Sequence, residues 1–187
     1  LGMLSTEKEI TDALNDKQVR DMTKSQLVKG AFRMLTLKLG QANIPLIVTN
    51  HTYDVIGSYV PTKEMGGGSG LKYAASTIIY LSKKKEKSEK EVVGNIIKAK
   101  TVKSRLSKEN KEVEIRLYYD DRGLDKYYGL LELGEIGGLW ANKAGRYEIN
   151  GKKVFAKQIL AKPEEYFTQE TMQSLDEIAR KHFSYGN

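Results

Sequence analysis

The stretch that decides the expected fold is Ile44-Pro45-Leu46-Ile47-Val48, which is followed by Thr49-Asn50-His51-Thr52. A short, continuous apolar run after a helical segment is typical of a strand that is buried on both faces of a parallel sheet. Ligands of open α/β sheets bind beyond the carboxyl ends of the strands. The sequence therefore predicts an α/β fold, with Asn50 and His51 where a ligand would be sensed. A purely structural histidine is the commoner alternative.

The segment before this run predicts a helix from Thr23 to about Gly40. Apolar residues recur along it at three- and four-residue spacing and form one buried stripe. The stripe consists of Val28, Ala31, Phe32, Leu35 and Leu39. Lys29 and Arg33 are four residues apart and therefore project from one flank of the same helix. Without further context, an ordinary solvated face is the favoured interpretation of these two cations.

Residues 52–70 show neither a helical nor a strand period, and they hold five glycines. A loop of this length inside a compact domain is usually functional or disordered. The run Gly66-Gly67-Gly68-Ser69-Gly70 would let backbone amides approach a phosphate closely, and Tyr53 and Tyr59 offer rings on which bases stack. A flexible linker is the alternative, but the apolar sequence on both sides favours a functional loop.

The chain has 31 basic and 24 acidic residues, and its net charge is +7. Residues 83–108 hold ten basic and three acidic side chains. The net charge of this stretch is therefore +7, which equals the net charge of the whole chain. The stretch is either a solvated basic surface or a contact for a polyanion, whose phosphates release counterions when they are neutralised.

Further strands are predicted over 74–81 and 92–100, with a charged hairpin tip over 83–90 between them. Glu112–Tyr118 alternates polar and apolar residues, which predicts a half-buried strand. The run Asp120-Asp121-Arg122-Gly123 predicts a turn, and its paired carboxylates are better explained as turn formers than as an acid–base pair.

Composition changes near residue 124, which divides the chain into a partial core over 1–123 and a small C-terminal α/β domain over 124–187. The C-terminal domain is expected to hold a helix, a hairpin on an Asn-Gly turn and two further helices. These elements cover 124–133, 146–155, 156–162 and 164–183, with Pro163 in the first turn of the last helix. At the other end of the chain, Thr6 and Glu9 predict a capping box.

Several kinds of protein are excluded by what the sequence lacks. Cysteine is absent, which excludes disulfides and thiolate metal sites and suits a cytoplasmic setting. Two histidines cannot make a three-histidine zinc centre, so no metal site is predicted. No apolar run approaches the roughly 20 residues of a membrane span, and no signal peptide is found. The chain begins with Leu1 and is expected to be a piece of a longer protein.

The motifs of a self-contained active site are also missing. The sequence holds no G-x-x-x-x-G-K-[ST] phosphate-binding loop and no G-x-S-x-G elbow or H-E-x-x-H helix. We therefore expect the chain alone to hydrolyse no ATP.

Four motifs nevertheless follow one another in a recognisable order. They are Leu1-Gly2-Met3-Leu4-Ser5-Thr6, Ile47-Val48-Thr49-Asn50-His51-Thr52-Tyr53, Met65-Gly66-Gly67-Gly68-Ser69-Gly70 and Lys98-Ala99-Lys100-Thr101-Val102-Lys103. In this order they resemble the RecA family of recombinases, most closely its bacteriophage UvsX-like branch. The likeness runs through about residues 1–140. It implies the C-terminal part of a RecA-like ATPase core sheet with helices, followed by a small α/β domain.

The resemblance implies a nucleotide site. His51 matches the family's γ-phosphate sensor, next to Asn50. Lys98 and Lys100 match a pair that reaches the neighbouring subunit's γ-phosphate and stabilises phosphoryl transfer in trans. Both ammonium groups would project from one face of a strand, since Ala99 lies between them. ATP and Mg²⁺ are the cofactors expected of the intact protein, and none is expected to bind this chain tightly.

The resemblance also implies DNA binding. Residues 52–70 match the second DNA-binding loop, and residues 11–20 match the first loop weakly. Lys29 and Arg33 fall where the intervening helix contacts the DNA backbone. In the second loop the expected contacts are Tyr59, Gly66, Gly67, Gly68 and Ser69. The expected partners are single-stranded DNA and further copies of the chain, in a filament or a dimer, and no membrane.

The expected function is part of an ATP-dependent recombinase that forms filaments on single-stranded DNA. It would promote strand exchange in homologous recombination and DNA repair, in the cytoplasm of a bacterial host. One alternative is a RecA-fold helicase or regulatory ATPase, which an arginine finger and a different loop order would favour. Another is a non-enzymatic, basic nucleic-acid-binding module.

Overall fold

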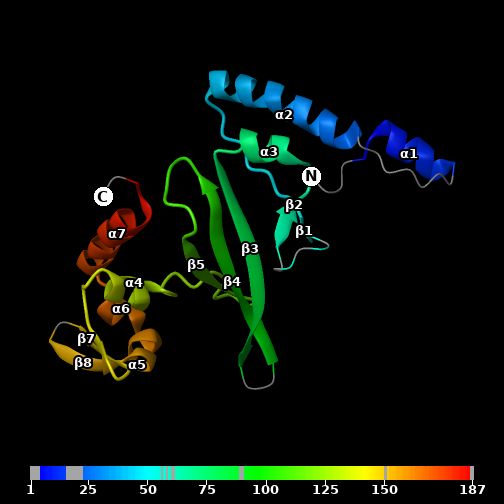
Figure 1. The fold of residues 1–187 in the computed structure, drawn as a ribbon. Coiled ribbons are helices and arrows are strands. Elements are labelled where there is room, and N and C mark those ends of the chain that lie inside the picture. The colour runs from blue at the N-terminus through cyan, green and yellow to red at the C-terminus, as the bar shows by residue number, and fades with distance from the viewer. Residues whose placement is uncertain are drawn as a thin grey trace. The chain divides into compact units, whose positions relative to one another are not determined.

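The computed structural model describes residues 5–15, 23–55, 57, 59, 62–88, 91–149 and 151–185, and its elements are drawn in Figure 1. The chain divides into two compact units, Leu1–Ser76 and Thr77–Asn187. Helices accompany three small antiparallel sheets in the described residues, so the predicted α/β class is confirmed. The predicted division at residue 124 lies inside the second unit and stays a prediction.

The first unit opens with two helices. Helix α1 (Glu7–Leu14) begins with the predicted capping box, in which the Glu9 amide donates to Thr6 Oγ1 and the Thr6 amide donates to Glu9 Oε2, both over 3.1 Å. Helix α1 also occupies part of the stretch expected to be the first DNA-binding loop, residues 11–20, whose remainder lies outside the described residues. The Lys24 ammonium of helix α2 (Thr23–Ala42) lies 3.3 Å from Glu9 Oε2, so an ion pair links the two helices.

The strand predicted over residues 44–48 is wrong, because residues 44–50 form no strand and the Ile47 side chain is 92% exposed. A central parallel strand needs neighbours on both of its edges, and no strand among the described residues pairs with this segment. The helix stripe is also only partly covered, since Val28, Phe32 and Leu39 are half-buried whereas Leu35 is exposed.

Residues 52–70 are more ordered than the predicted loop. Strand β1 (Thr52–Asp54) pairs with strand β2 (Lys63–Met65) as an antiparallel hairpin. Helix α3 (Ser69–Ala74) follows directly. Gly67 and Gly68 join the hairpin to the helix with φ angles of 92° and 75°, a left-handed conformation that only glycine adopts readily. The glycines therefore make a turn rather than an open loop.

The second unit is built on a sheet in the order β3-β4-β5, with strands β3 (Thr77–Ser88), β4 (Glu91–Ser104) and β5 (Glu112–Tyr118). The predicted strand over Glu112–Tyr118 is confirmed, but its burial does not alternate, because residues 112–114 are exposed and residues 115–118 are half-buried. The charged tip is shorter than predicted, because residues 83–88 are paired with β4 and only residues 89–90 lie outside the description.

The predicted turn after β5 is confirmed. The Arg122 amide and guanidinium both donate to the Asp120 carboxylate. These hydrogen bonds lower the pKa of Asp120 to about 2. The carboxylate therefore stays charged and serves the turn.

The C-terminal part of this unit packs helices around a small sheet (Figure 1). Its elements are α4 (Leu130–Ile136), β6 (Asn142–Lys143), β7 (Arg146–Ile149), β8 (Lys152–Phe155), α5 (Ala156–Ala161), α6 (Pro163–Tyr166) and α7 (Gln169–Phe183). The β7–β8 hairpin is confirmed. The helix predicted over 124–133 begins only at Leu130, and the one predicted over 164–183 is broken near Phe167, where the Thr168 hydroxyl caps α7.

Eight buried side chains form the core of this region. They are Leu131, Trp140, Tyr147, Ile149, Val154, Ile159, Phe167 and Leu175. The Trp140 indole donates to the Leu131 carbonyl over 2.8 Å, and a Cβ at Gly134 would come within 2.2 Å of the Trp140 ring. Glycine at 134 is therefore required for α4 to lie against Trp140.

The end of α7 docks on the turn between β4 and β5. The Lys108 amide donates to the Phe183 carbonyl over 2.8 Å, and Ser107 bridges Ser184. The Lys111 ammonium lies 3.2 Å from His182 Nε2. Because an ammonium can only donate, Nε2 must be the unprotonated acceptor.

This contact predicts that the docking weakens in acid. Burial, together with the positive charges of Lys111 and Lys108, lowers the pKa of His182. The neutral ring is therefore favoured in the folded chain, and its contribution to stability is lost as the pH falls through about 6.5 toward the lowered value. Nuclear magnetic resonance (NMR) titration of the ring C–H signals should give a midpoint below 6.5. His182→Gln, which keeps an acceptor, should reduce the acid destabilisation. A midpoint at or above 6.5 would contradict this account.

Candidate functional site

Asn50 ties the start of the β1–β2 hairpin to its end. Its Nδ2 donates to the Gly66 carbonyl over 2.7 Å, and its Oδ1 accepts from the His51 amide over 2.9 Å. The Gly66 amide donates in turn to the His51 carbonyl over 3.1 Å. Two expected nucleotide residues, Asn50 and His51, are thus joined directly to the first expected DNA-binding glycine.

The glycine turn (Gly66-Gly67-Gly68-Ser69-Gly70) lies against the first half of α2. A Cβ at Gly70 would come within 2.6 Å of Lys29 Cγ and 3.2 Å of Lys29 Cα. A Cβ at Gly68 would lie 3.7 Å from Ser25 Cβ. The approach of Gly70 to Lys29 leaves no room for a Cβ, whereas the distance at Gly68 is an ordinary van der Waals contact. The turn therefore lies next to Lys29, one of the two cations on the flank of this helix.

The structure brings together most of the residues expected to bind DNA. Lys29 is exposed beside the glycine turn, and Arg33 is exposed one helical turn further along α2. Tyr59 is fully exposed between β1 and β2. Tyr53 is also exposed, and one edge of its ring lies against the turn, 3.0 Å from the Cβ position of Gly66. The exposed cations suit contact with a phosphate backbone.

The Lys98–Lys100 pair belongs to the second unit. Buried Ala99 lies between the two lysines on β4, so both ammonium groups project from the same face, as predicted. Glu112 on β5 lies 2.5 Å from Lys98 Nζ through Oε2 and 3.5 Å from Lys100 Nζ through Oε1. Its hydrogen bond and negative charge raise the pKa of Lys98, and the Lys98 hydrogen bond lowers the pKa of Glu112. Lys98 and Glu112 are therefore both charged at neutral pH.

The next carboxylate on β5 has other partners. Glu114 lies opposite Lys98 in the strand register. Its Oε1 nevertheless lies 3.6 Å from Lys84 Nζ, and its Oε2 accepts from the Tyr128 hydroxyl over 3.0 Å. Glu112 and Glu114 thus differ in role although they stand on the same face.

Arg116 connects this sheet to the start of the C-terminal region. Its guanidinium lies 3.7 Å from Glu86 and 3.5 Å from Asp125, and 4.2 Å above the centre of the Tyr128 ring. The sequence analysis missed both Arg116 and Glu112. Both residues lie on the polar face of the strand that the alternation predicts, so the sequence did place them together. Their partners, however, depend on how β5 pairs with β4, which the sequence pattern does not give.

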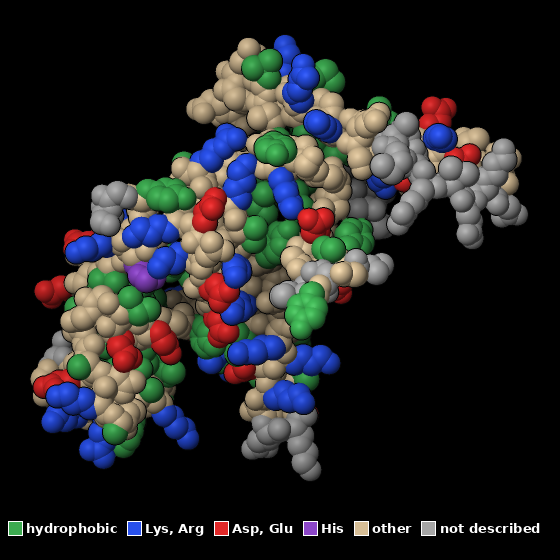
Figure 2. Space-filling view, viewed as in Figure 1, with side chains coloured by type: hydrophobic (Ala, Val, Ile, Leu, Met, Phe, Trp, Pro, Cys, Tyr) green, Lys and Arg blue, Asp and Glu red, His purple; other side chains and the backbone are tan. Residues whose placement is uncertain are grey.

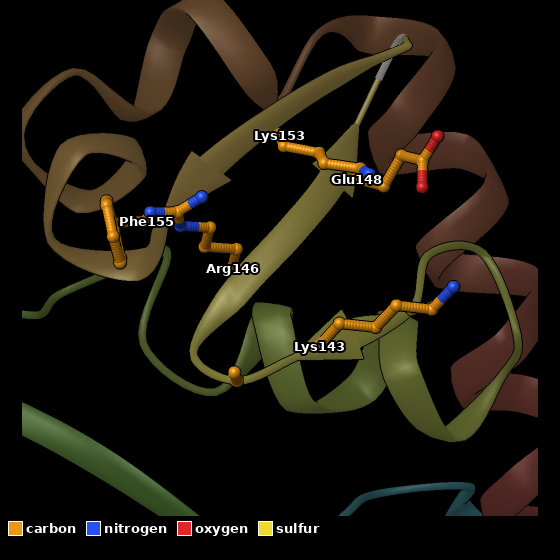
Figure 3. Close-up of a pocket in the computed structure, with 7 residues that line it drawn as sticks. Lys143, Arg146, Glu148, Lys153 and Phe155 are labelled. Atoms are coloured by element: carbon orange, nitrogen blue, oxygen red, sulfur yellow. The ribbon is translucent and has the colours of Figure 1, made fainter.

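Two other basic surfaces contain none of the predicted site residues. Figure 2 shows Lys and Arg side chains around the far end of the β3–β4 hairpin, where Lys83, Lys84, Lys85 and Lys87 are exposed. A hollow of about 340 Å³ is lined by residues of β6, β7 and β8 and of the turn between β6 and β7, and Figure 3 shows Lys143, Arg146, Glu148, Lys153 and Phe155 around it. Arg146 lies 4.6 Å above the Phe155 ring there, so the exposed ring is already covered on one face.

Two lysines of β4 could contact a phosphate group. Lys98 and Lys100 offer two ammonium groups on one face. Within the described ranges, no group of three histidine, aspartate or glutamate side chains could hold a metal. In the same ranges, no helix has the length and apolar character to cross a membrane.

The family model of the RecA N-terminal domain matches residues 1–125 of the chain. The match covers more than half of the sequence, and the chain therefore belongs to the RecA family.

The similar curated proteins are named for recombination and repair or as RecA. The chain is 38% identical over 148 residues to the "Recombination and repair protein" of Enterobacteria phage T4, covering 79% of this chain and 37% of that protein. It is 31% identical over 149 residues to "Protein RecA" of Caulobacter vibrioides, covering 79% and 40%. The chain thus spans about two fifths of the length of the curated relatives that it matches.

The Asn50 hydrogen bonds predict a measurable effect on the hairpin. Asn50→Ala removes both bonds, and a neutral hydrogen bond contributes about 1 kcal/mol. The Gly66 and Val55 amides, which donate to His51 and Thr62, should exchange with solvent about fivefold faster or more in the variant. His51→Ala keeps the backbone groups and is the matched control, with rates within about twofold of the original. Equal rates in the two variants would show that Asn50 does not hold the turn.

Proposed function

We propose that the chain is part of an ATP-dependent recombinase that forms filaments on single-stranded DNA and promotes strand exchange. Membership of the RecA family supports this proposal, together with relatives named for recombination and repair. The observation that carries it is the contact between the glycine turn and Lys29 on α2. Two segments that the family resemblance assigns to DNA binding, and that are about 40 residues apart in the sequence, are neighbours.

The proposed DNA contact uses backbone amides of the glycine turn together with Lys29 and Arg33. Single-strand binding without sequence preference needs cations that follow the phosphates and groups that tolerate any base. Tyr59, which is fully exposed, would add a ring for stacking. Asn50 and His51 would transmit the state of the nucleotide, because Asn50 is hydrogen-bonded to Gly66 and His51. A phosphate contact at His51 would thereby bias the turn and couple nucleotide binding to DNA affinity.

The proposed nucleotide contact uses Lys98 and Lys100, which would act on the γ-phosphate held by a neighbouring subunit. ATP with Mg²⁺ supplies the phosphoryl group and its charge neutralisation when bound to the whole protein. The two lysines of this chain would contribute positive charge where negative charge develops.

The salt dependence of DNA binding tests this proposal. The affinity of the chain for a single-stranded oligonucleotide should fall by roughly 0.7 log units per log unit of salt for each phosphate contact. Lys29→Ala or Arg33→Ala should each reduce that slope by about one contact and weaken binding at low salt. Fluorescence anisotropy over a series of salt concentrations measures both quantities.

Lys38→Ala is the matched control, because Lys38 lies on the same helix nine residues after Lys29 and therefore about half a turn around it. Its slope should be that of the original chain. If Lys38→Ala and Lys29→Ala flatten the slope equally, or neither changes it, DNA does not bind along this flank of α2. The exposed lysines of the β3–β4 hairpin would then be the next candidates.

A further inference from the structure

A single carboxylate is shared between the two lysines of β4. Glu112 uses a different oxygen for each, Oε2 for Lys98 and Oε1 for Lys100. It stands opposite Lys100 in the strand register and diagonal to Lys98, and such diagonal neighbours are within reach of long side chains. Two like charges on alternate residues of a strand are about 6.6 Å apart along the backbone, so a bridging anion relieves their repulsion.

The bridge is accessible and easily broken. The side chains of Lys98, Lys100 and Glu112 are 47%, 46% and 37% exposed. Water screens ion pairs at such positions, and their net contribution to stability is small. A phosphate group offers more negative charge and more acceptor oxygens than a carboxylate. An arriving phosphate would therefore compete well for the same two ammonium groups.

We propose that Glu112 is an exchangeable partner of Lys98 and Lys100, and that its carboxylate holds the two ammonium groups in place until a phosphate group replaces it. Glu112 is thus a positioning residue that also sets the threshold for phosphate binding. The exchange needs only the contacts within this chain. Only the identity of that phosphate, as the terminal phosphate of a nucleotide, rests on the proposed function.

Glu114 does not share this role, although it is the direct register partner of Lys98. Lys84 and the Tyr128 hydroxyl already take up its two oxygens. Replacing Glu114 removes one negative charge from the same strand face and leaves the bridge intact. Glu114→Gln is therefore the matched control for Glu112→Gln, because it makes the same substitution, removes the same charge and lies on the same strand.

Binding of tripolyphosphate to the chain tests the exchange directly. The side-chain NMR signals of Lys98 and Lys100 report binding at this pair and separate it from the other lysines. One unit charge about 4 Å away in water changes an affinity about fivefold. Glu112→Gln should therefore bind tripolyphosphate at this pair about fivefold more tightly, and Glu114→Gln should stay within about twofold of the original. High salt should reduce the difference.

The Glu112 carboxyl signal gives a second readout that a merely structural residue would not show. Adding tripolyphosphate should return the lowered pKa of Glu112 toward its usual value, because the lysines are then occupied. Unchanged or weaker binding in Glu112→Gln, or a carboxyl titration that does not respond to tripolyphosphate, would overturn the proposal.

Steady-state ATP turnover of the full-length protein separates this inference from the proposed function. Glu112→Gln should lower the ATP concentration for half-maximal turnover about fivefold and keep the maximal rate within about twofold. If Lys98→Ala with Lys100→Ala leaves turnover intact, the proposed function is wrong, while the exchange on the chain is judged by its NMR result. If that double variant is inactive but Glu112→Gln behaves like Glu114→Gln, only the exchange is wrong.

Discussion

The antiparallel register between β4 and β5 determines the chemistry of the second unit. It pairs Lys100 with Glu112 and Lys98 with Glu114, so the polar faces of the two strands meet as cations against carboxylates. A shift of one residue would turn each of these side chains to the opposite face. At Gly94 a Cβ would come within 2.3 Å of the Leu117 carbonyl, which helps to fix this register near the end of β5.

The first unit depends on a different constraint, the close approach of backbone segments that only glycine permits. Gly70 lies on Lys29, and Gly66 lies on the Tyr53 ring. Gly67 and Gly68 have φ angles that other residues rarely adopt. The glycines of the proposed DNA contact also fix the turn beside α2. Packing and the proposed DNA contact therefore require the same glycines.

Local patterns in the sequence predicted local elements well. The strand over Glu112–Tyr118, the capping box at Thr6 and the Asp120–Arg122 turn are all found in the structure. The apolar run over 44–48 failed as a strand, because a buried strand is defined by neighbours in space and not by its own residues. The hairpin within 52–70 was missed for a related reason, since its two strands have three residues each and show no period.

The candidate site was predictable to a similar extent. Lys98 and Lys100 were identified from a motif and their shared face from strand geometry, but Glu112 becomes their partner only through the register. Lys29 and the glycine turn were identified separately, and only the packing of α3 on α2 brings them together. Residue types and spacings thus indicate which groups act. The partners of those groups follow from tertiary contacts between segments distant in the sequence.

The central claim is that Lys98 and Lys100 act on a phosphate held by a neighbouring subunit, and mixing two inactive variants of the full-length protein tests it most directly. One variant carries Lys98→Ala and Lys100→Ala, and the other has a disabled phosphate-binding site with both lysines intact. If the lysines act in trans, the mixture should regain DNA-dependent ATP turnover, because intact lysines of one subunit then face an intact phosphate site of the next. A mixture as inactive as its two components would contradict the account.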